Sequence, residues 1–556
     1  MKFFLLFFVS CTVALTAQGN PSTRLGTSRS TGLGASGETP LHSAVYRDDL
    51  QAVERLIAGG ANVRAANREG VTPLAMACLA GNLPIVERLL KAGADPKERG
   101  PNGETMLMFA ARNGNVALIT RLVAARVDVN AREELRGTTA LMWAAEQRHP
   151  EAVKALLAAG ADPAIATGPA GLPQNYMAPR VNVAAVQQAR ERRARAAAAG
   201  RTYDEQLAFE RSQAPRGQGQ APQRPPDDDS DLIQAGLVGS GGGGLTALVF
   251  AAREGDIESA KALVGRGAKI NQTTEYGWTP LLTAVNNRNY ALAGMLIERG
   301  ADVNLLNKGG WTPLYLATDN RNIEGGDYPV PKPDLDHLEI IKALLKHGAN
   351  PNARVHDNTL TRTIFTMQWF FEDGATAFVR AAQSSDIELI KLLLEYKADP
   401  FMATANGDTA LTAAGGIGWV EGVTYERSPQ ENVEALRLLL DLGFDPNGAN
   451  SEGRTALMGA ALKGRNAAVQ LLVDRGANLD QHDRGSRDTD KIGSAAAGHT
   501  WQALDYAEGL VRVGVQSATA YPETAALIRR LLKEHGLPVP PENRNILSIC
   551  VVALCQ

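Results

Sequence analysis

The sequence repeats itself with a period of 33 residues. A threonine that opens a short apolar run marks each unit, and within two groups these threonines are 33 residues apart: Thr39, Thr72 and Thr105, then Thr246, Thr279 and Thr312. A unit of this length cannot bury a core of its own, so neighbouring units must stack on one another. The period therefore predicts a solenoid, and argues against the roughly three or four globular domains that the chain length alone would suggest.

Within each unit the residues predict two short helices. In the second unit, Thr72 can cap the free N–H groups of a helix, and Pro73 suits its first position because proline has no N–H to leave unpaired. The later segment "PIVERLLKAG" carries an apolar stripe and ends at Gly93, a residue type that favours the left-handed conformation found at helix ends. Motifs such as "AGADPKE" and "RGADVNL" then lead through a turn into the next threonine.

The motif "TPLHSA" at Thr39, set in a 33-residue period, resembles the ankyrin repeat. The resemblance covers about residues 37 to 536 apart from insertions. It implies an all-α repeat solenoid of eleven repeats, each a helix-turn-helix with a β-hairpin finger, in a curved array. The last repeat departs from the pattern because Gln502 occupies the threonine position. The insertions and the N-terminal segment resemble exported bacterial ankyrin proteins more than short-looped eukaryotic arrays.

Breaks in the period and shifts in composition give the expected organisation. It comprises a signal peptide (1–19), a flexible linker (20–36), repeats 1–4 (37–168), a low-complexity and partly helical insertion (169–240), repeats 5–11 (241–536) and a C-terminal tail (537–556). Shorter insertions interrupt repeats seven and nine, where "IEGGDYPVPKPDLDH" and "GIGWVEGVTYERSPQ" separate the two helices of a repeat. Insertions at such places are expected to lie in loops on one side of the array.

The N-terminus, "MKFFLLFFVSCTVALTAQG", predicts export. One lysine, an apolar run and small residues near Ala17 describe a secretory signal peptide, with cleavage expected after Ala17 or Gly19. The apolar run is short for a membrane span of about 20 residues, so the mature chain is expected to have no span. We therefore expect a periplasmic or secreted protein. Lipoprotein anchoring through Cys11 is the lesser alternative, because "FVSC" matches a lipidation motif only loosely.

The remaining cysteines and the charge exclude several classes of protein. Outside the signal peptide there are only Cys78, Cys550 and Cys555, too few for a disulfide framework. Cys78 is expected in the core, whereas Cys550 and Cys555 can either form a disulfide or remain two buried thiols. A net charge of −3 gives no overall attraction to nucleic acid or anionic membranes.

Sequence motifs for catalysis, metal binding or nucleotide binding are nearly absent. It contains no H-E-x-x-H, no C-x-x-C and no P-loop. "GSGGGG" at Gly239–Gly244 matches the glycine pattern of dinucleotide-binding proteins, but no strand precedes it, so we interpret it as a flexible joint. We therefore predict no enzyme activity, no catalytic residues, no cofactor and no metal.

In the ankyrin family, partners are usually held by finger tips and by the exposed side of the first helix. Transferred to this sequence, the resemblance implies a partner-binding set of eight residues: Trp143, Tyr276, Trp278, Arg288, Lys308, Trp311, Asp319 and Asn320. Trp278 and Trp311 each stand directly before a helix-opening Thr-Pro. Large aromatics beside Arg and Asn suit an interface, but they could equally pack against one another, and both alternatives stay open at this point.

The predicted function is that of an exported, non-enzymatic scaffold that binds a protein partner through its finger tips and concave helix face. We expect a monomer that binds no nucleic acid. The alternative is an effector or enzyme-accessory protein whose activity lies in the 169–240 insertion or in the tail.

Overall fold

The computed structural model describes residues 37–168, 243–323, 331–356, 374–419, 424–425, 427–484, 500–511 and 519–542, with the single residues 195, 199 and 209. The predicted signal peptide, the linker, Cys550 and Cys555 lie outside these residues. So does the 169–240 insertion, apart from the three single residues. In the part of the chain that the structure describes, no helix is long and apolar enough to cross a membrane.

Helices follow one another in pairs. The first helices are α1 (Pro40–Tyr46), α3 (Pro73–Ala80), α5 (Met106–Asn113), α7 (Ala140–Glu146), α11 (Ala247–Glu254), α13 (Pro280–Asn286), α15 (Pro313–Arg321), α18 (Ala377–Gln383), α20 (Ala410–Gly415), α22 (Ala456–Leu462) and α24 (Ala503–Ala507). The second helices are α2 (Leu50–Ala58), α4 (Leu83–Lys91), α6 (Val116–Ala124), α8 (Pro150–Ala158), α12 (Ile257–Gly265), α14 (Tyr290–Glu298), α16 (His337–Lys346), α19 (Ile387–Glu395), α21 (Pro429–Asp441), α23 (Asn466–Asp474) and α25 (Pro522–Glu534).

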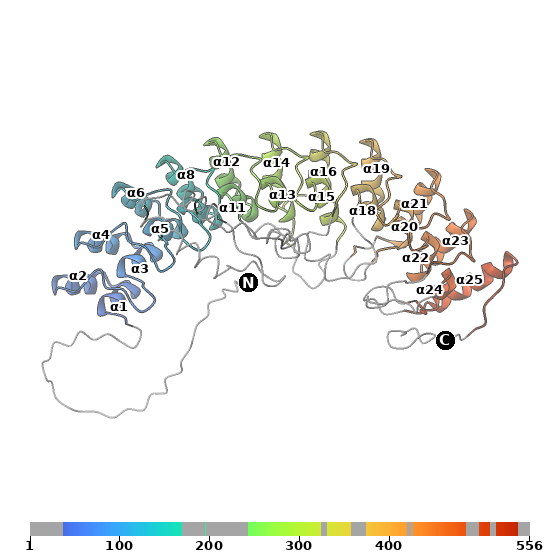
Figure 1. Cartoon of the computed structure of the whole chain (residues 1–556), viewed down its shortest axis with the longest axis horizontal. Helices are drawn as coiled ribbons and strands as arrows, with labels where there is room; N and C mark the ends of the chain where they lie inside the picture. The colour runs from blue at the N-terminus through green and yellow to red at the C-terminus, as the bar shows by residue number, and fades with distance from the viewer. Residues whose placement is uncertain are drawn as a thin grey trace, which may run out of the picture.

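The pairs stack side by side, so that the helices form two layers along an arch (Figure 1). Each first helix packs against the first helix of the next pair, and these helices form the inner layer of the arch (Figure 1). The second helices form the outer layer. One continuous core of buried side chains runs between the layers from Leu41 to Leu532. This is the solenoid that the period predicts.

The capping role of the repeated threonine is confirmed. In every first helix but the last, its side chain accepts a hydrogen bond from the backbone N–H three residues on; for example, Ala75 donates to Thr72 Oγ1 at 3.1 Å. Gln502 takes this position at α24, where its backbone N–H donates to Asp505 Oδ2 at 2.8 Å. Cys78 is fully buried, as expected for a core position.

The fingers differ from the predicted β-hairpins. The described residues form no strand, only isolated β-bridges such as Arg99↔Thr105 and Ala449↔Thr455. The fingers whose residues are all described are instead tight turns: for example, the Asn67 N–H donates to the Val71 oxygen at 2.9 Å, and Gly70 adopts a φ of 78° that a side chain would disfavour. Neighbouring fingers are joined by further backbone bonds, including Glu134 N–H to Asn102 O at 2.8 Å and Lys308 N–H to Tyr276 O at 3.0 Å. The arms are too short to form a ladder within one finger.

The array is continuous across the long insertion. Helix α7 packs against α11, and α8 packs against α12. The Thr167 N–H donates to Leu245 O at 2.9 Å, and Arg253 pairs with Glu146 at 2.8 Å. Residues 169–242 therefore leave and rejoin the chain between two consecutive stacked repeats.

Candidate functional site

The first helices carry a row of large apolar side chains on their exposed side. The residue four positions after the capping threonine is Met76 in α3, Phe109 in α5 and Trp143 in α7, and all three are partly exposed among buried neighbours. Three positions further on stand Tyr46 and Leu79, which are 81% and 46% exposed. We call these five residues the apolar strip. The five residues belong to α1, α3, α5 and α7, which lie in the inner layer of the arch (Figure 1).

Phe109 and Trp143 connect neighbouring repeats within the strip. Their rings meet edge to face, with centroids 6.1 Å apart, and Arg112 lies 5.9 Å from the Trp143 ring. Trp143 Nε1 donates to Thr138 Oγ1 at 2.8 Å, and the Thr138 hydroxyl donates in turn to the buried Glu133 at 2.8 Å. These bonds fix the indole against the adjacent finger. Trp143 is thus a predicted partner-binding residue that the structure places on the surface.

The strip ends at the fifth repeat. Phe250 occupies the same register but is only 5% exposed, because Arg253 lies over its ring at 4.9 Å. Arg253 is itself held by Glu146 at 2.8 Å and Glu254 at 2.7 Å.

The two finger tryptophans are not on the surface. Trp278 is 2% exposed and Trp311 is fully buried, with the Trp311 ring edge to face with Tyr315 at 4.9 Å. Leu245 and Trp501, which also stand directly before the first helix of a repeat, are buried at the equivalent position. Burial contradicts direct contact of these two indoles with a partner, and the Trp311 ring meets that of Tyr315 in α15 of its own repeat.

Tyr276 and Lys308 lie on adjacent fingers. Lys308 is exposed, and its Nζ is 5.5 Å from the centroid of the partly buried Tyr276 ring. Both predicted residues can therefore be reached from solvent.

Arg288, Asp319 and Asn320, in contrast, are 8% exposed or less and join repeats from within. Asn320 Nδ2 donates to Val285 O at 2.8 Å, and Arg288 donates to Asn320 O at 3.1 Å. Asp319 accepts from Arg380 Nε at 2.8 Å. The prediction that these three side chains contact a partner is contradicted by their burial. Polar residues near the end of a first helix favoured a position on the surface, but here they form hydrogen bonds to the neighbouring repeat.

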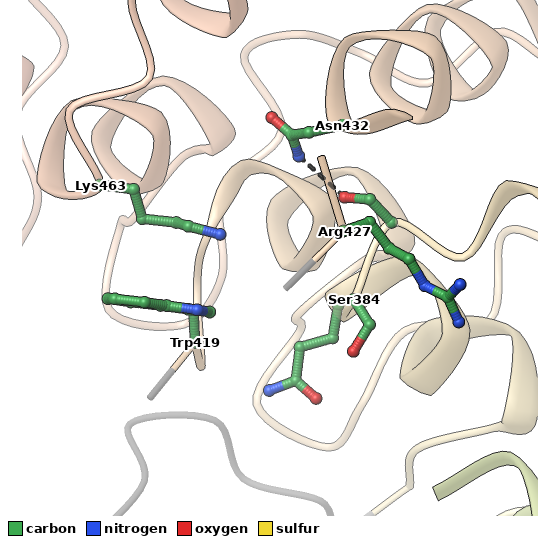
Figure 2. Close-up of a pocket in the computed structure, with 7 residues that line it drawn as sticks. Ser384, Trp419, Arg427, Asn432 and Lys463 are labelled. Atoms are coloured by element: carbon green, nitrogen blue, oxygen red, sulfur yellow. Dashed lines mark hydrogen bonds between the residues drawn. The ribbon is translucent and has the colours of Figure 1, made fainter. Parts of the chain in front are cut away.

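Further along the array, a small polar hollow joins repeats eight to ten. It is lined by Gln383, Ser384, Ser385, Trp419, Arg427, Asn432 and Lys463. Figure 2 shows Lys463 stacked on the Trp419 ring, 4.9 Å from its centroid, and Asn432 donating to Ser385 at 2.8 Å. Arg427 pairs with the buried Asp386 at 3.0 Å. The lining groups bond mainly to one another and to backbone, so we assign the hollow a structural role.

His337, at the start of α16, packs against Tyr290 with ring centroids 5.4 Å apart. Burial and the positive charges of Arg288 and Arg321 lower the pKa of His337 to about 4, although Asp336 acts in the opposite direction. The ordinary histidine pKa is near 6.5. Between pH 6.5 and pH 4 the unfolded state therefore binds more protons than the folded state, and stability is lost as the pH falls through this range.

We expect His337→Gln to reduce the loss of stability between pH 6.5 and pH 4 by about 1–2 kcal/mol, a figure lowered for partial solvent screening. Urea unfolding at both pH values, followed by circular dichroism, measures the difference. His535→Gln, which replaces an exposed histidine at the end of α25, is the matched control substitution. An identical pH dependence in wild type and His337→Gln would contradict the assignment.

Among the described residues, no group of three His, Cys, Asp or Glu side chains is placed to hold a metal ion. Four residues of the apolar strip were not predicted from the sequence: Tyr46, Met76, Leu79 and Phe109. Their register from the capping threonine could have revealed them, because all four stand four or seven positions after it.

Comparison with known proteins agrees with this architecture. The family model described as "Ankyrin repeats (3 copies)" matches residues 14–100, 93–167, 248–355 and 428–483, more than half of the chain. The chain belongs to the ankyrin repeat family. Ankyrin repeats generally mediate protein–protein interaction, and the fold is typically non-enzymatic.

Among solved structures, the chain is similar to the crystal structure of the human ASB11 ankyrin repeat domain. The match has 19% sequence identity and a TM-score of 0.36, and it covers 56% of this chain and 100% of that chain. No curated protein sequence gives a significant match.

Proposed function

We propose that this protein is an exported, non-enzymatic scaffold of eleven ankyrin repeats in a curved array, which binds a protein partner on the exposed face of its first helices. The observation that carries the proposal is the apolar strip. Tyr46 and Leu79 are large apolar side chains left open to solvent at one register of adjacent repeats, beside Met76, Phe109 and Trp143. Exposed apolar side chains that recur at one register of adjacent repeats favour an interaction surface, and aromatic residues are enriched at binding hot spots.

Other features support the remaining parts of the proposal. The successive helix pairs from α1–α2 to α24–α25 support eleven repeats. Tyr276 and Lys308 extend the proposed surface along the fingers. The apolar N-terminal segment supports export to the periplasm or the medium, which cell fractionation and the mass of the mature N-terminus would test.

We expect the double variant Tyr46→Ser/Leu79→Ser to lose at least tenfold in capture of the partner by crosslinking in the native host. Both side chains are exposed, so the substitutions should leave the melting temperature within a few degrees of wild type. The matched control is Leu306→Ser/Phe401→Ser, which removes apolar side chains 47% and 54% exposed elsewhere on the array. The assignment would be wrong if the strip variant and the control captured the same proteins in the same amounts.

A further inference from the structure

The chain's charge is uneven around the apolar strip. Five arginines near the strip are exposed and have no carboxylate within ion-pair distance among the described residues: Arg47, Arg68, Arg112, Arg136 and Arg148. We call them the arginine rim. The whole chain carries a net charge of −3, and residues 37–168 contain as many acidic as basic residues. The rim is therefore a matter of where the exposed arginines stand, and not of the net charge of these repeats.

The rim residues stand before and after the strip residues in the order of elements in a repeat. A finger precedes each first helix, and a turn to the second helix follows it. Arg68 and Arg136 belong to fingers, whereas Arg47, Arg112 and Arg148 stand at the ends of first helices α1, α5 and α7. The strip residues lie between these two positions in the chain. A segment lying along the strip would therefore have cations on both flanks.

Most nearby carboxylates are already engaged within the protein. Glu133 accepts hydrogen bonds from the Arg136 and Thr138 N–H groups at 3.0 and 2.8 Å. Glu146 and Glu254 both pair with Arg253. Glu104 accepts from the Asn102 backbone and side chain, at 2.9 Å each. The hydrogen-bonded carboxylates keep their charge, and Glu38, Asp48 and Glu69 are exposed, so these acids partly offset the rim. The five exposed arginines still outnumber the three exposed acids at the edges of the strip.

We infer that the strip and the arginine rim together bind an acidic amphipathic segment of a partner protein, in which apolar side chains are flanked by carboxylates. The inference rests on the proposed function and names the partner's chemistry. Apolar side chains would cover Tyr46, Leu79, Phe109 and Trp143, and the carboxylates would meet guanidinium groups, which can bind them in a bidentate manner. Complementary charges at an interface rim mainly set the association rate and exclude wrong partners.

A random 16-residue peptide library displayed on phage tests the inference with the full chain as bait. Selection on wild type, with counter-selection on Tyr46→Ser/Leu79→Ser, should enrich peptides that combine apolar residues with Asp or Glu. Strip-dependent peptides that are neutral or basic would overturn the inference and leave the proposed binding function standing. Failure to enrich any strip-dependent peptide would overturn both the inference and the proposed binding function.

A series of charge-reversal variants then tests the contribution of the arginine rim separately from that of the apolar strip. For an enriched acidic peptide, Arg112→Glu/Arg136→Glu should weaken binding at least tenfold by fluorescence anisotropy, and exchanging the peptide's acids for lysine should restore part of the loss. Arg266→Glu/Arg299→Glu is the matched control, because both residues are exposed and follow second helices α12 and α14. Binding to wild type should weaken as salt rises, because rim charges are screened. Equal losses in the rim variant and the control would overturn the role of the rim.

Discussion

Replacing Trp311 by alanine is expected to lower the free energy of unfolding by about 3–5 kcal/mol, the range for removal of a large buried aromatic. The indole is fully buried and packs edge to face against Tyr315. Its loss leaves a cavity that the helices can close only in part. Urea unfolding of wild type and variant, followed by far-ultraviolet circular dichroism, measures the change.

Leu306→Ala is the control for this experiment, because Leu306 is 47% exposed nearby in the array. It should change the free energy of unfolding by about 0.5 kcal/mol or less. If Trp311→Ala were equally mild, the indole would not be a core residue, and the surface role predicted from sequence would regain support.

Arg380→Met is expected to destabilise the protein by about 3–5 kcal/mol, because it leaves a buried carboxylate without its cation. Arg380 Nε donates to Asp319 at 2.8 Å, and the two side chains are only 4% and 1% exposed. The same guanidinium donates to Asn322 O at 2.8 Å and Gln383 Oε1 at 3.0 Å. One substitution therefore removes bonds that join repeat seven to repeat eight.

Two further variants interpret the result. In Asp319→Leu/Arg380→Met both charges are absent, so much of the stability should return. Arg88→Met removes an exposed pair, with Glu54, whose side chains are 50% and 42% exposed, and should cost about 1 kcal/mol or less. If Arg380→Met and Arg88→Met lowered the free energy of unfolding equally, Arg380 would not be essential to the contact between repeats seven and eight.

The sequence predicted much of the fold because the repeat unit is locally encoded. A threonine cap, a proline after it and an apolar stripe each act within a few residues, so Thr72 and Pro73 could be interpreted without knowing their neighbours. The prediction of β-hairpin fingers was wrong because the arms of a finger are too short for a ladder, so only isolated bridges form within it. The bonds to the next finger depend on how the repeats stack, which the motif of a single repeat does not show.

The site was predicted less well, because burial depends on the neighbouring repeat. An aromatic before a helix start indicates a position on the finger, but not whether the side chain points outward or between repeats. Trp278 and Trp311 point inward, and Trp143, inside a helix, is the partly exposed one. Tyr46 and Leu79 were missed because the same register carries Arg112 and Glu146 in later repeats, which made it look like ordinary polar surface.

The place where residues 169–242 depart from the array has a consequence for how the sequence of this protein can evolve. The chain leaves after Gly168 and returns at Gly243, and the bond from Thr167 N–H to Leu245 O holds the two points together at 2.9 Å. A flexible segment inserted between two ends that are fixed by stacking would cost only loop-closure entropy, about 0.6 kcal/mol for each doubling of its length. Sequence can therefore be gained, lost or exchanged at this junction with little effect on the scaffold, which makes it a natural attachment point for new modules.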